Sequence, residues 1–388
     1  MAEAMIDGHR VRFQLDGAVD APVLAFVNGL TQYSNLWDAY SEHFSQRGMR
    51  VLRFDMLGQG ASDKPALGGR FEDHWRTLDA ILDHVGVETA YVAGISYGGT
   101  VAVQFAAERP ERCAGLIAMS CFSEMPPQLF MMGCGLYEAL VQIGLPSLQR
   151  WLMPMNMSDD WLEANKDALP EMMRRGYAIN DLYALQNLME SVNDFKPITH
   201  RLPDIACPTL ILNGEYDFFT PRKCHDVLRN GIRKSRLVIV QHAYHAYTLE
   251  HPAVTMRLIG AFLKAAQAGT WPGDQSVWVA DDDPEAPEPW FPCPGDHLRA
   301  VPLPGVAPEE GPAATQSVDV DLSPPETPAP GPRTTKPKPA SRSATPNKRA
   351  SRKLAADSKA EASAEAQAKP SRAADAPRIR RPARKEGN

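Results

Sequence analysis

The chain has 388 residues, 44% hydrophobic and 23% charged, as is ordinary for a globular protein. Proline and charge are unevenly spread. Residues 1–268 hold 13 of the 34 prolines, residues 269–332 carry one basic against 12 acidic side chains, and residues 333–388 carry 16 against five. We therefore predict a folded domain over 1–268, an acidic proline-rich linker over 269–332 and a basic disordered tail over 333–388.

Several classes of protein are disfavoured at once. No apolar run approaches the roughly 20 residues that span a bilayer, and the first residues lack the basic start and apolar core of a secretory signal. The six cysteines are irregularly spaced without a Cys-x-x-Cys pair, which indicates reduced thiols rather than a zinc site or a disulfide framework. No Walker motif, His-Glu-x-x-His or Rossmann glycine spacing occurs. We expect a cytoplasmic protein that needs no metal or cofactor.

The elements alternate along the chain. An alternating strand at 9–15 is followed by continuous apolar strands, which are separated by segments with helical spacing. Strands that are apolar on both faces and alternate with helices are typical of a parallel sheet covered on both sides, so the fold class is α/β. The apolar strands are expected at 22–29, 50–60, 89–99, 115–120, 208–217 and 236–241, with later helices near 222–230 and at 251–266.

One long interruption breaks this rhythm between residues 123 and 202. It holds nine of the 15 methionines and no strand-like run, and Pro, Gly and Asn divide it into short helical pieces. A helical insertion between parallel strands would lie at the carboxyl edge of the sheet, where α/β proteins bind ligands. We interpret it as a lid over a pocket for a long apolar substrate, although methionine also serves as plain core filling.

The sequence Gly94-Ile95-Ser96-Tyr97-Gly98-Gly99 lies between a predicted strand and a predicted helix. Gly-x-Ser-x-Gly in this context permits a tight turn that exposes the Ser96 hydroxyl at a helix N-terminus. A serine nucleophile needs a base and a third group that orients the base. Asp217 follows a later strand and His245 follows the next one. Glu215 and His242 lie close to them and remain competitors at this stage.

With these residues, positions 9–266 resemble the α/β-hydrolase superfamily in its lipase-box serine branch. The resemblance implies catalysis by Ser96, Asp217 and His245, since the family spacing from histidine to a Glu-x-Pro helix start fits His245 with Glu250-His251-Pro252 and does not fit His242. It also implies an oxyanion hole from the N–H groups of Leu30 and Tyr97. Tyr244 departs from the glycine that usually precedes the histidine.

A second departure is Asn28-Gly29, where most members of the superfamily read His-Gly. Asn-Gly together with Ser-aromatic-Gly-Gly resembles enzymes of 3-hydroxyacyl groups, including intracellular medium-chain polyhydroxyalkanoate depolymerases and hydroxyacyl transferases. Asn-Gly is also an ordinary turn dipeptide. The resemblance disfavours haloalkane dehalogenases and epoxide hydrolases, which have aspartate at the position of Ser96.

The sequence therefore predicts a serine hydrolase that cleaves an apolar acyl or 3-hydroxyacyl ester through an acyl-enzyme. One alternative is an acyltransferase that passes the acyl group to an alcohol or thiol. Another is a scaffold that works through its charged tail on a storage granule or nucleoid. The basic tail would bind a polyanion such as DNA or polyphosphate or a granule surface, or remain a solvated appendage. The tryptophans at 271, 278 and 290 would fold back onto the domain or dock on a partner.

Overall fold

The computed structural model describes residues 2–66 and 69–293. Residues 294–388 lie outside the described part, and with them most of the predicted acidic linker and the whole predicted basic tail. The strands are β1 (Ala2–Ile6), β2 (His9–Asp16), β3 (Val23–Val27), β4 (Arg50–Phe54), β5 (Ala90–Ile95), β6 (Cys113–Met119), β7 (Thr209–Gly214), β8 (Ser235–Val240), β9 (Val277–Ala280) and β10 (Phe291–Pro292).

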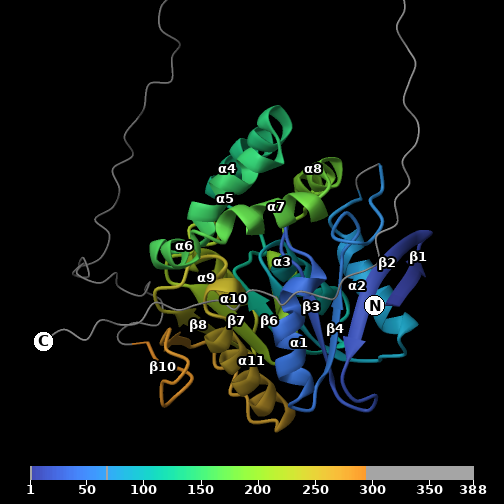
Figure 1. Cartoon of the computed structure of the whole chain (residues 1–388). Coiled ribbons are helices and arrows are strands. Elements are labelled where there is room, and N and C mark those ends of the chain that lie inside the picture. Colours follow the sequence, from blue (N-terminus) through green and yellow to red (C-terminus); the bar gives the residue numbers. More distant parts are fainter. Residues whose placement is uncertain (1, 67–68, 294–388) are drawn as a thin grey trace, which may run out of the picture. The chain divides into compact units, whose positions relative to one another are not determined.

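Helices connect most of these strands (Figure 1). The α-helices are α1 (Asp38–Ser45), α2 (Asp73–His84), α3 (Tyr97–Glu108), α4 (Pro127–Glu138), α5 (Leu145–Asn156), α6 (Asp159–Asn165), α7 (Leu169–Ile179), α8 (Leu182–Ser191), α9 (Arg222–Gly231), α10 (Tyr247–Glu250) and α11 (Pro252–Gln267). Short 3-10 turns lie at Ser34–Trp37, Val192–Asp194 and Thr199–Asp204, and a π-helical turn at Ala139–Ile143 joins α4 to α5.

All ten described strands form one sheet in the order β1-β2-β4-β3-β5-β6-β7-β8-β9-β10. The pairs from β4 through β9 are parallel, whereas β1, β2 and β10 pair antiparallel at the two edges. The predicted, mostly parallel α/β sheet is thus confirmed. Every expected apolar strand occurs. The apolar runs locate these strands because a strand that helices cover on both faces must be apolar on both faces.

Each face of the sheet carries its own hydrophobic core. On one face, α2, α3 and α9 pack residues such as Leu78, Val101 and Leu228 against the strands. On the other face, α1 and α11 contribute Phe44 and Phe262. Figure 1 shows α1 and α11 side by side in front of the sheet. The parallel strands therefore end at one common edge, where the loops after β3, β5, β7 and β8 lie.

The sheet extends further along the chain than the predicted boundary at residue 268. Strand β9 pairs with β8 in parallel, and its Val277, Val279 and Ala280 are buried. The ring of Trp271 packs edge-on against Phe262 at a centroid distance of 4.8 Å. The predicted linker thus begins too early, because the proline and acidic residues around β9 masked a short strand whose stability comes from pairing with β8 and from burial in the sheet cores. For residues 271–293 the fold-back alternative is the one observed.

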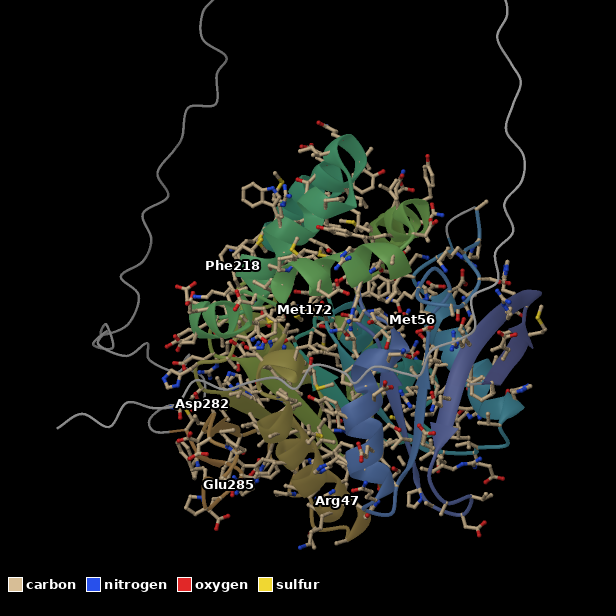
Figure 2. The ribbon with its side chains drawn as sticks, in the orientation of Figure 1. Arg47, Met56, Met172, Phe218, Asp282 and Glu285 are labelled. Atoms are coloured by element: carbon tan, nitrogen blue, oxygen red, sulfur yellow. The ribbon has the colours of Figure 1, made fainter. Side chains whose placement is uncertain are left out.

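Between β6 and β7 the described chain contains helices and turns only, from α4 to the turn at Thr199–Asp204. Helices α4 and α7 bury no residue. Seven of the eleven exposed large hydrophobic side chains among the described residues belong to this insertion, so its outer surface is more apolar than that of the sheet domain. Figure 2 shows Met172 on α7 and Phe218 on the loop after β7.

The cysteines and the helix lengths complete the description of the fold. All six cysteines are reduced thiols outside any disulfide, five of them buried, as the irregular spacing predicts. The Cys207 thiol donates a hydrogen bond to Cys113 Sγ at 3.7 Å, and the two sulfur atoms form no disulfide. In the part of the chain that the structure describes, no helix combines the length and apolarity needed to cross a membrane.

Candidate active site

Ser96 stands at the turn between β5 and α3, in a conformation that is rare for a residue with a side chain. Its φ is 56° and its ψ is −122°. Such strain costs on the order of 1–3 kcal/mol and persists only where neighbouring structure imposes it. Here a Cβ on Gly94 would overlap the carbonyl of Gly98, and a Cβ on Gly98 would overlap the carbonyls of Val27 and Asn28. The two glycines are therefore required by close backbone approach.

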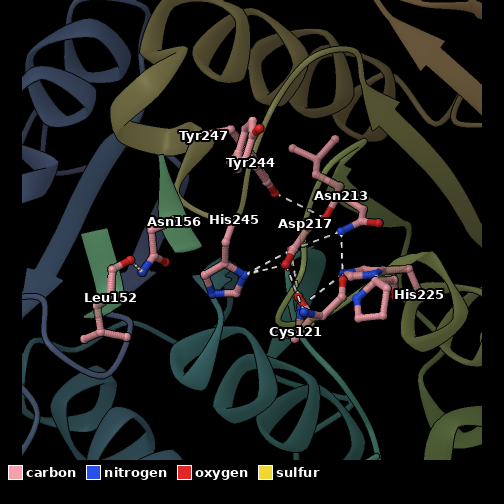
Figure 3. Close-up of polar contacts among 12 residues, drawn as sticks. Cys121, Leu152, Asn156, Asn213, Asp217, His225, Tyr244, His245 and Tyr247 are labelled. Atoms are coloured by element: carbon pink, nitrogen blue, oxygen red, sulfur yellow. Dashed lines mark hydrogen bonds and ion pairs between the residues drawn. The ribbon is translucent and has the colours of Figure 1, made fainter. Parts of the chain in front are cut away.

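Asp217 and His245 meet at the ends of β7 and β8. His245 Nδ1 lies 2.9 Å from Asp217 Oδ1 and 3.0 Å from Oδ2, and both side chains are buried (Figure 3). The carboxylate also accepts hydrogen bonds from the Thr220 N–H at 2.9 Å, the Thr220 hydroxyl at 2.8 Å and Asn213 Nδ2 at 3.2 Å. These donors leave the carboxylate in one fixed orientation.

The charge of Asp217 follows from the same contacts. Burial alone would raise the pKa of Asp217, but the adjacent His245 and the Thr220 N–H outweigh it and hold the pKa below its ordinary value. The side chain is thus a carboxylate at neutral pH. A buried carboxylate on Nδ1 fixes the imidazole tautomer and leaves Nε2 as the proton acceptor.

The competing residues lie elsewhere. Glu215 Oε2 accepts the backbone N–H of His242 at 2.9 Å. The His242 side chain is half exposed and lies 3.5 Å from Asp282. Glu215 thus joins the loop after β7 to the loop after β8 by accepting the N–H of His242. The side chains of Asp217 and His245, by contrast, contact each other.

Asn28, at the end of β3, belongs to a buried hydrogen-bond network. Its Nδ2 donates to the Phe54 carbonyl at 2.9 Å and to Gln59 Oε1 at 3.1 Å. Its Oδ1 accepts from Trp37 Nε1 at 2.9 Å. Because the amide is satisfied on both sides within the protein, Asn28 ties the β3 loop to the β4 loop.

Gln59 fixes the direction of the next peptide groups. Its Nε2 donates to the carbonyls of Gly29 at 2.7 Å and Leu30 at 3.1 Å. In a trans peptide the N–H points away from the preceding carbonyl, so the bond to the Gly29 carbonyl turns the N–H of Leu30 away from Gln59. The N–H of Tyr97 belongs to the first turn of α3, where backbone donors have no partner within the helix.

Two of the contacts between the insertion and these loops are apolar clusters. Leu30 packs against a cluster of insertion leucines, and Ala246, next to His245, packs against a second cluster around the α5–α6 junction. The buried members of the first cluster are Leu140, Leu145, Leu148 and Leu185, and the buried insertion residues of the second are Met157 and Trp161. The insertion thus gives these loops two apolar contacts, together with a polar one in which the Ser191 hydroxyl on α8 lies 2.8 Å from the Tyr97 hydroxyl.

Several residues of this arrangement escaped the sequence analysis. Gln59 lies in the Gly-rich loop after β4, which reads as a common loop of the fold. Thr220 and Asn213 flank Asp217, and only their short spacing from the acid would have signalled them. Buried His225 accepts the Cys121 N–H at 3.1 Å, and burial lowers its pKa to about 4.

Comparisons with known proteins agree with this architecture. A family model described as alpha/beta hydrolase fold matches residues 22–252. A 2-hydroxy-6-oxononadienedioate/2-hydroxy-6-oxononatrienedioate hydrolase from Paraburkholderia xenovorans is 28% identical over 267 residues, which cover 64% of this chain and 89% of the relative.

Two solved structures share the fold. The enol-lactonase from Burkholderia xenovorans LB400 has a TM-score of 0.62 and 22% identity, covering 68% of this chain and all of the other. Est816, described as an N-acyl homoserine lactone degrading enzyme, has a TM-score of 0.58 and 24% identity, covering 67% of this chain and all of the other.

Proposed function

The chain belongs to the α/β-hydrolase family, and from that premise we propose that it is a serine hydrolase that opens a carboxylic ester or lactone through an acyl-enzyme. Ser96 is the nucleophile, His245 the general base and acid, and Asp217 the group that orients the imidazole. The observation that carries the proposal is the buried contact of His245 Nδ1 with the Asp217 carboxylate, at the same edge of the sheet as the strained Ser96.

The proposed reaction has two halves. Ser96 Oγ attacks the carbonyl carbon while His245 Nε2 takes the hydroxyl proton, and the N–H groups of Leu30 and Tyr97 hold the developing oxyanion. The carbon–oxygen bond then breaks, and His245 returns the proton to the leaving alcohol. Water repeats the sequence on the acyl-enzyme, giving the carboxylic acid and free Ser96. A positive charge on the imidazole is stabilised by the ionised Asp217 at each half.

The substrate class follows from what surrounds the loops. The insertion clusters beside Leu30 and Ala246 are apolar, which favours an uncharged, apolar acyl group. The relative from Paraburkholderia is named for a dicarboxylate substrate, so carbon–carbon bond hydrolysis is a second candidate function. Both reactions begin at a carbonyl carbon. They differ in whether oxygen or carbon leaves.

The 3-hydroxyacyl ester and the acyltransferase remain narrower forms of the proposal. The hydroxyacyl resemblance relied partly on Asn28-Gly29, but Asn28 has internal partners in Phe54, Gln59 and Trp37, which is reason enough for an asparagine there. Polyhydroxyalkanoate-type esters therefore form one member of a substrate panel. Granule attachment and polyanion binding were assigned to the tail, which lies outside the described residues, and they are separate from the proposed chemistry.

The test is turnover by purified full-length protein on a graded panel. The panel comprises p-nitrophenyl esters of increasing chain length, an aliphatic lactone, a 3-hydroxyacyl ester and 2-hydroxy-6-oxononadienedioate, each with and without an acceptor thiol. We expect ester or lactone turnover that Ser96→Ala lowers by about 10⁴-fold or more without a change in melting temperature. Equal turnover by the Ser96→Ala protein would overturn the proposal. Preference for the dienedioate would select the second candidate, and thiol-dependent product would select the transferase.

A further inference from the structure

Hydrogen bonds hold the backbone on both sides of His245, one from α10 and one from the insertion. The N–H of Tyr244 donates to Glu250 Oε2 at 3.1 Å, and the N–H of Ala246 donates to the Asn156 carbonyl at the end of α5, also at 3.1 Å. Figure 3 shows Tyr244, His245 and Asn156 close together. The residue before His245 and the residue after it are therefore both tied down.

Glu250 extends the first of these ties to the insertion as well. Its other carboxylate oxygen, Oε1, accepts the N–H of Ser158 at 3.0 Å. Ser158 caps α6, with its hydroxyl accepting the Trp161 N–H at 3.2 Å. Hydrogen bonds to a carboxylate are roughly twice as strong as neutral ones. One side chain thus joins the loop of His245 to the α5–α6 junction.

Apolar contacts also join the α5–α6 junction to the loop of His245. Met157 and Trp161 pack with Ala246, and Leu249 lies against the cluster that these three residues form. This contrasts with α4, which buries no residue, so the α5–α6 junction is the part of the insertion that is anchored beside the proposed base. A loop fixed by two hydrogen bonds and an apolar cluster has little freedom to rotate.

We propose that Glu250 is a positioning residue that couples the seating of the α5–α6 junction to the placement of His245. This inference rests on the proposed function, since it assigns work to His245. The imidazole must keep Nδ1 on Asp217 while Nε2 reaches the nucleophile, and a misplacement of about 1 Å can cost on the order of 10²-fold in rate. Glu250 sets this placement through Tyr244, and Ser158 sets the position of Glu250.

Ser158 offers a matched pair of variants that isolates the bond to Glu250. Its φ of −71° and ψ of 158° suit proline, and Met157 before it, at −126° and 148°, has the extended backbone that a following proline requires. Ser158→Pro removes both the N–H and the capping hydroxyl, whereas Ser158→Ala removes the hydroxyl alone. The difference between the two variants therefore reports the N–H bond to Glu250.

The experiment measures kcat, KM and the labelling rate of Ser96 by a fluorophosphonate, together with melting temperature, on full-length protein. We expect Ser158→Ala to stay within about twofold of the parent. Ser158→Pro should lower kcat and the labelling rate about tenfold relative to Ser158→Ala, with KM nearly unchanged. Glu250→Ala should lose more, and Glu250→Gln, which keeps one acceptor oxygen, should fall between Glu250→Ala and the parent.

A double variant tests whether Ser158 acts through Glu250. Ser158→Pro added to Glu250→Ala should cost no further kcat beyond Ser158→Ala in that background, because its partner is already gone. If Ser158→Pro equals Ser158→Ala in kcat and labelling, or if Glu250→Ala lowers only the melting temperature, Glu250 is merely structural and the inference is wrong. Failure of the proposed function would be distinct, since fluorophosphonate labelling and turnover would then survive Ser96→Ala.

Discussion

In the loops at the carboxyl edge of the sheet, polar groups are buried and bonded, whereas in the insertion apolar groups are left in solvent. The Asp217 carboxylate has donors from Thr220, Asn213 and His245, and the Asn28 amide is bonded at both ends. Helices α4 and α7 have no fully buried residue and present side chains such as Met131 at 67% exposure.

The two regions meet two different requirements of an enzyme. Acid–base chemistry needs atoms fixed to fractions of an ångström, which buried and fully satisfied networks provide. Substrate selection needs apolar area and tolerates variation, which helices with exposed methionine, aromatic and branched aliphatic side chains provide. We therefore expect substitutions in the edge loops to change kcat and substitutions on the outside of the insertion to change substrate preference.

The largest expected effect comes from comparing two histidines in one loop. His245→Ala should lower ester turnover by about 10⁴-fold, matching Ser96→Ala, because it removes the proposed base. His242→Ala, three residues earlier, should change the rate by less than about tenfold because its side chain is half exposed and faces Asp282. Initial rates on a p-nitrophenyl ester decide the ranking. The reverse ranking would show that His245 is not the base.

A smaller effect is expected at Gln59, which contacts the backbone of the proposed oxyanion donor. Gln59→Glu keeps an acceptor for Asn28 but loses the two hydrogen bonds to the carbonyls of Gly29 and Leu30. We predict a loss of roughly 10- to 100-fold in kcat with KM changed less, since a loosened oxyanion donor weakens the transition state selectively. Gln46→Glu makes the same change on the exposed end of α1 and should leave kcat intact. Equal kcat values for the two variants would show that Gln59 does not position the proposed oxyanion donor.

The next prediction tests the sheet itself. Cutting the chain after residue 268 deletes β9, whose Val277 and Val279 are buried and whose backbone pairs with β8. Burial of one valine side chain contributes about 1.5–3 kcal/mol, so this truncation should lower the free energy of unfolding by several kcal/mol. Urea denaturation of the truncated and full-length proteins measures the difference. An unchanged midpoint would show that the sheet does not need β9.

Buried histidines predict a pH effect on stability. Burial lowers the pKa of His74 and of His225 to about 4, from an ordinary 6.5. Between these values the unfolded chain binds a proton at each site that the folded protein does not, so stability present above pH 6.5 is lost as pH falls toward 4, by on the order of 3 kcal/mol per histidine. His225→Gln should reduce the slope of unfolding free energy against pH in this window by about one proton. Parallel slopes for parent and variant would contradict the assignment.

The sequence predicts those features that depend on local pattern. Apolar runs locate the strands, the glycines around Ser96 locate the turn, and the α/β-hydrolase fold is confirmed. It does not predict β9, because four residues in an acidic, proline-rich stretch carry too little pattern and gain their stability from β8. The roles of Gln59 and Glu250 also lie beyond it, since each also bonds a backbone group distant in the sequence, the Gly29 carbonyl about 30 residues from Gln59 and the Ser158 N–H about 90 residues from Glu250. A backbone partner leaves no trace in the identity of the residue that supplies it.

The smallest effect is expected from a cut after residue 293. This truncation keeps β9, β10 and every described residue of the two sheet cores, so it removes none of the described contacts of Ser96, Asp217 and His245. Ester turnover and the urea midpoint should both match the full-length protein. The same pair of proteins tests the predicted role of the basic tail, because only the full-length chain should bind DNA or polyphosphate at low salt and release it as salt rises. A fall in turnover on removal of residues 294–388 would show that the comparison between edge loops and insertion omits a third region that contributes to catalysis.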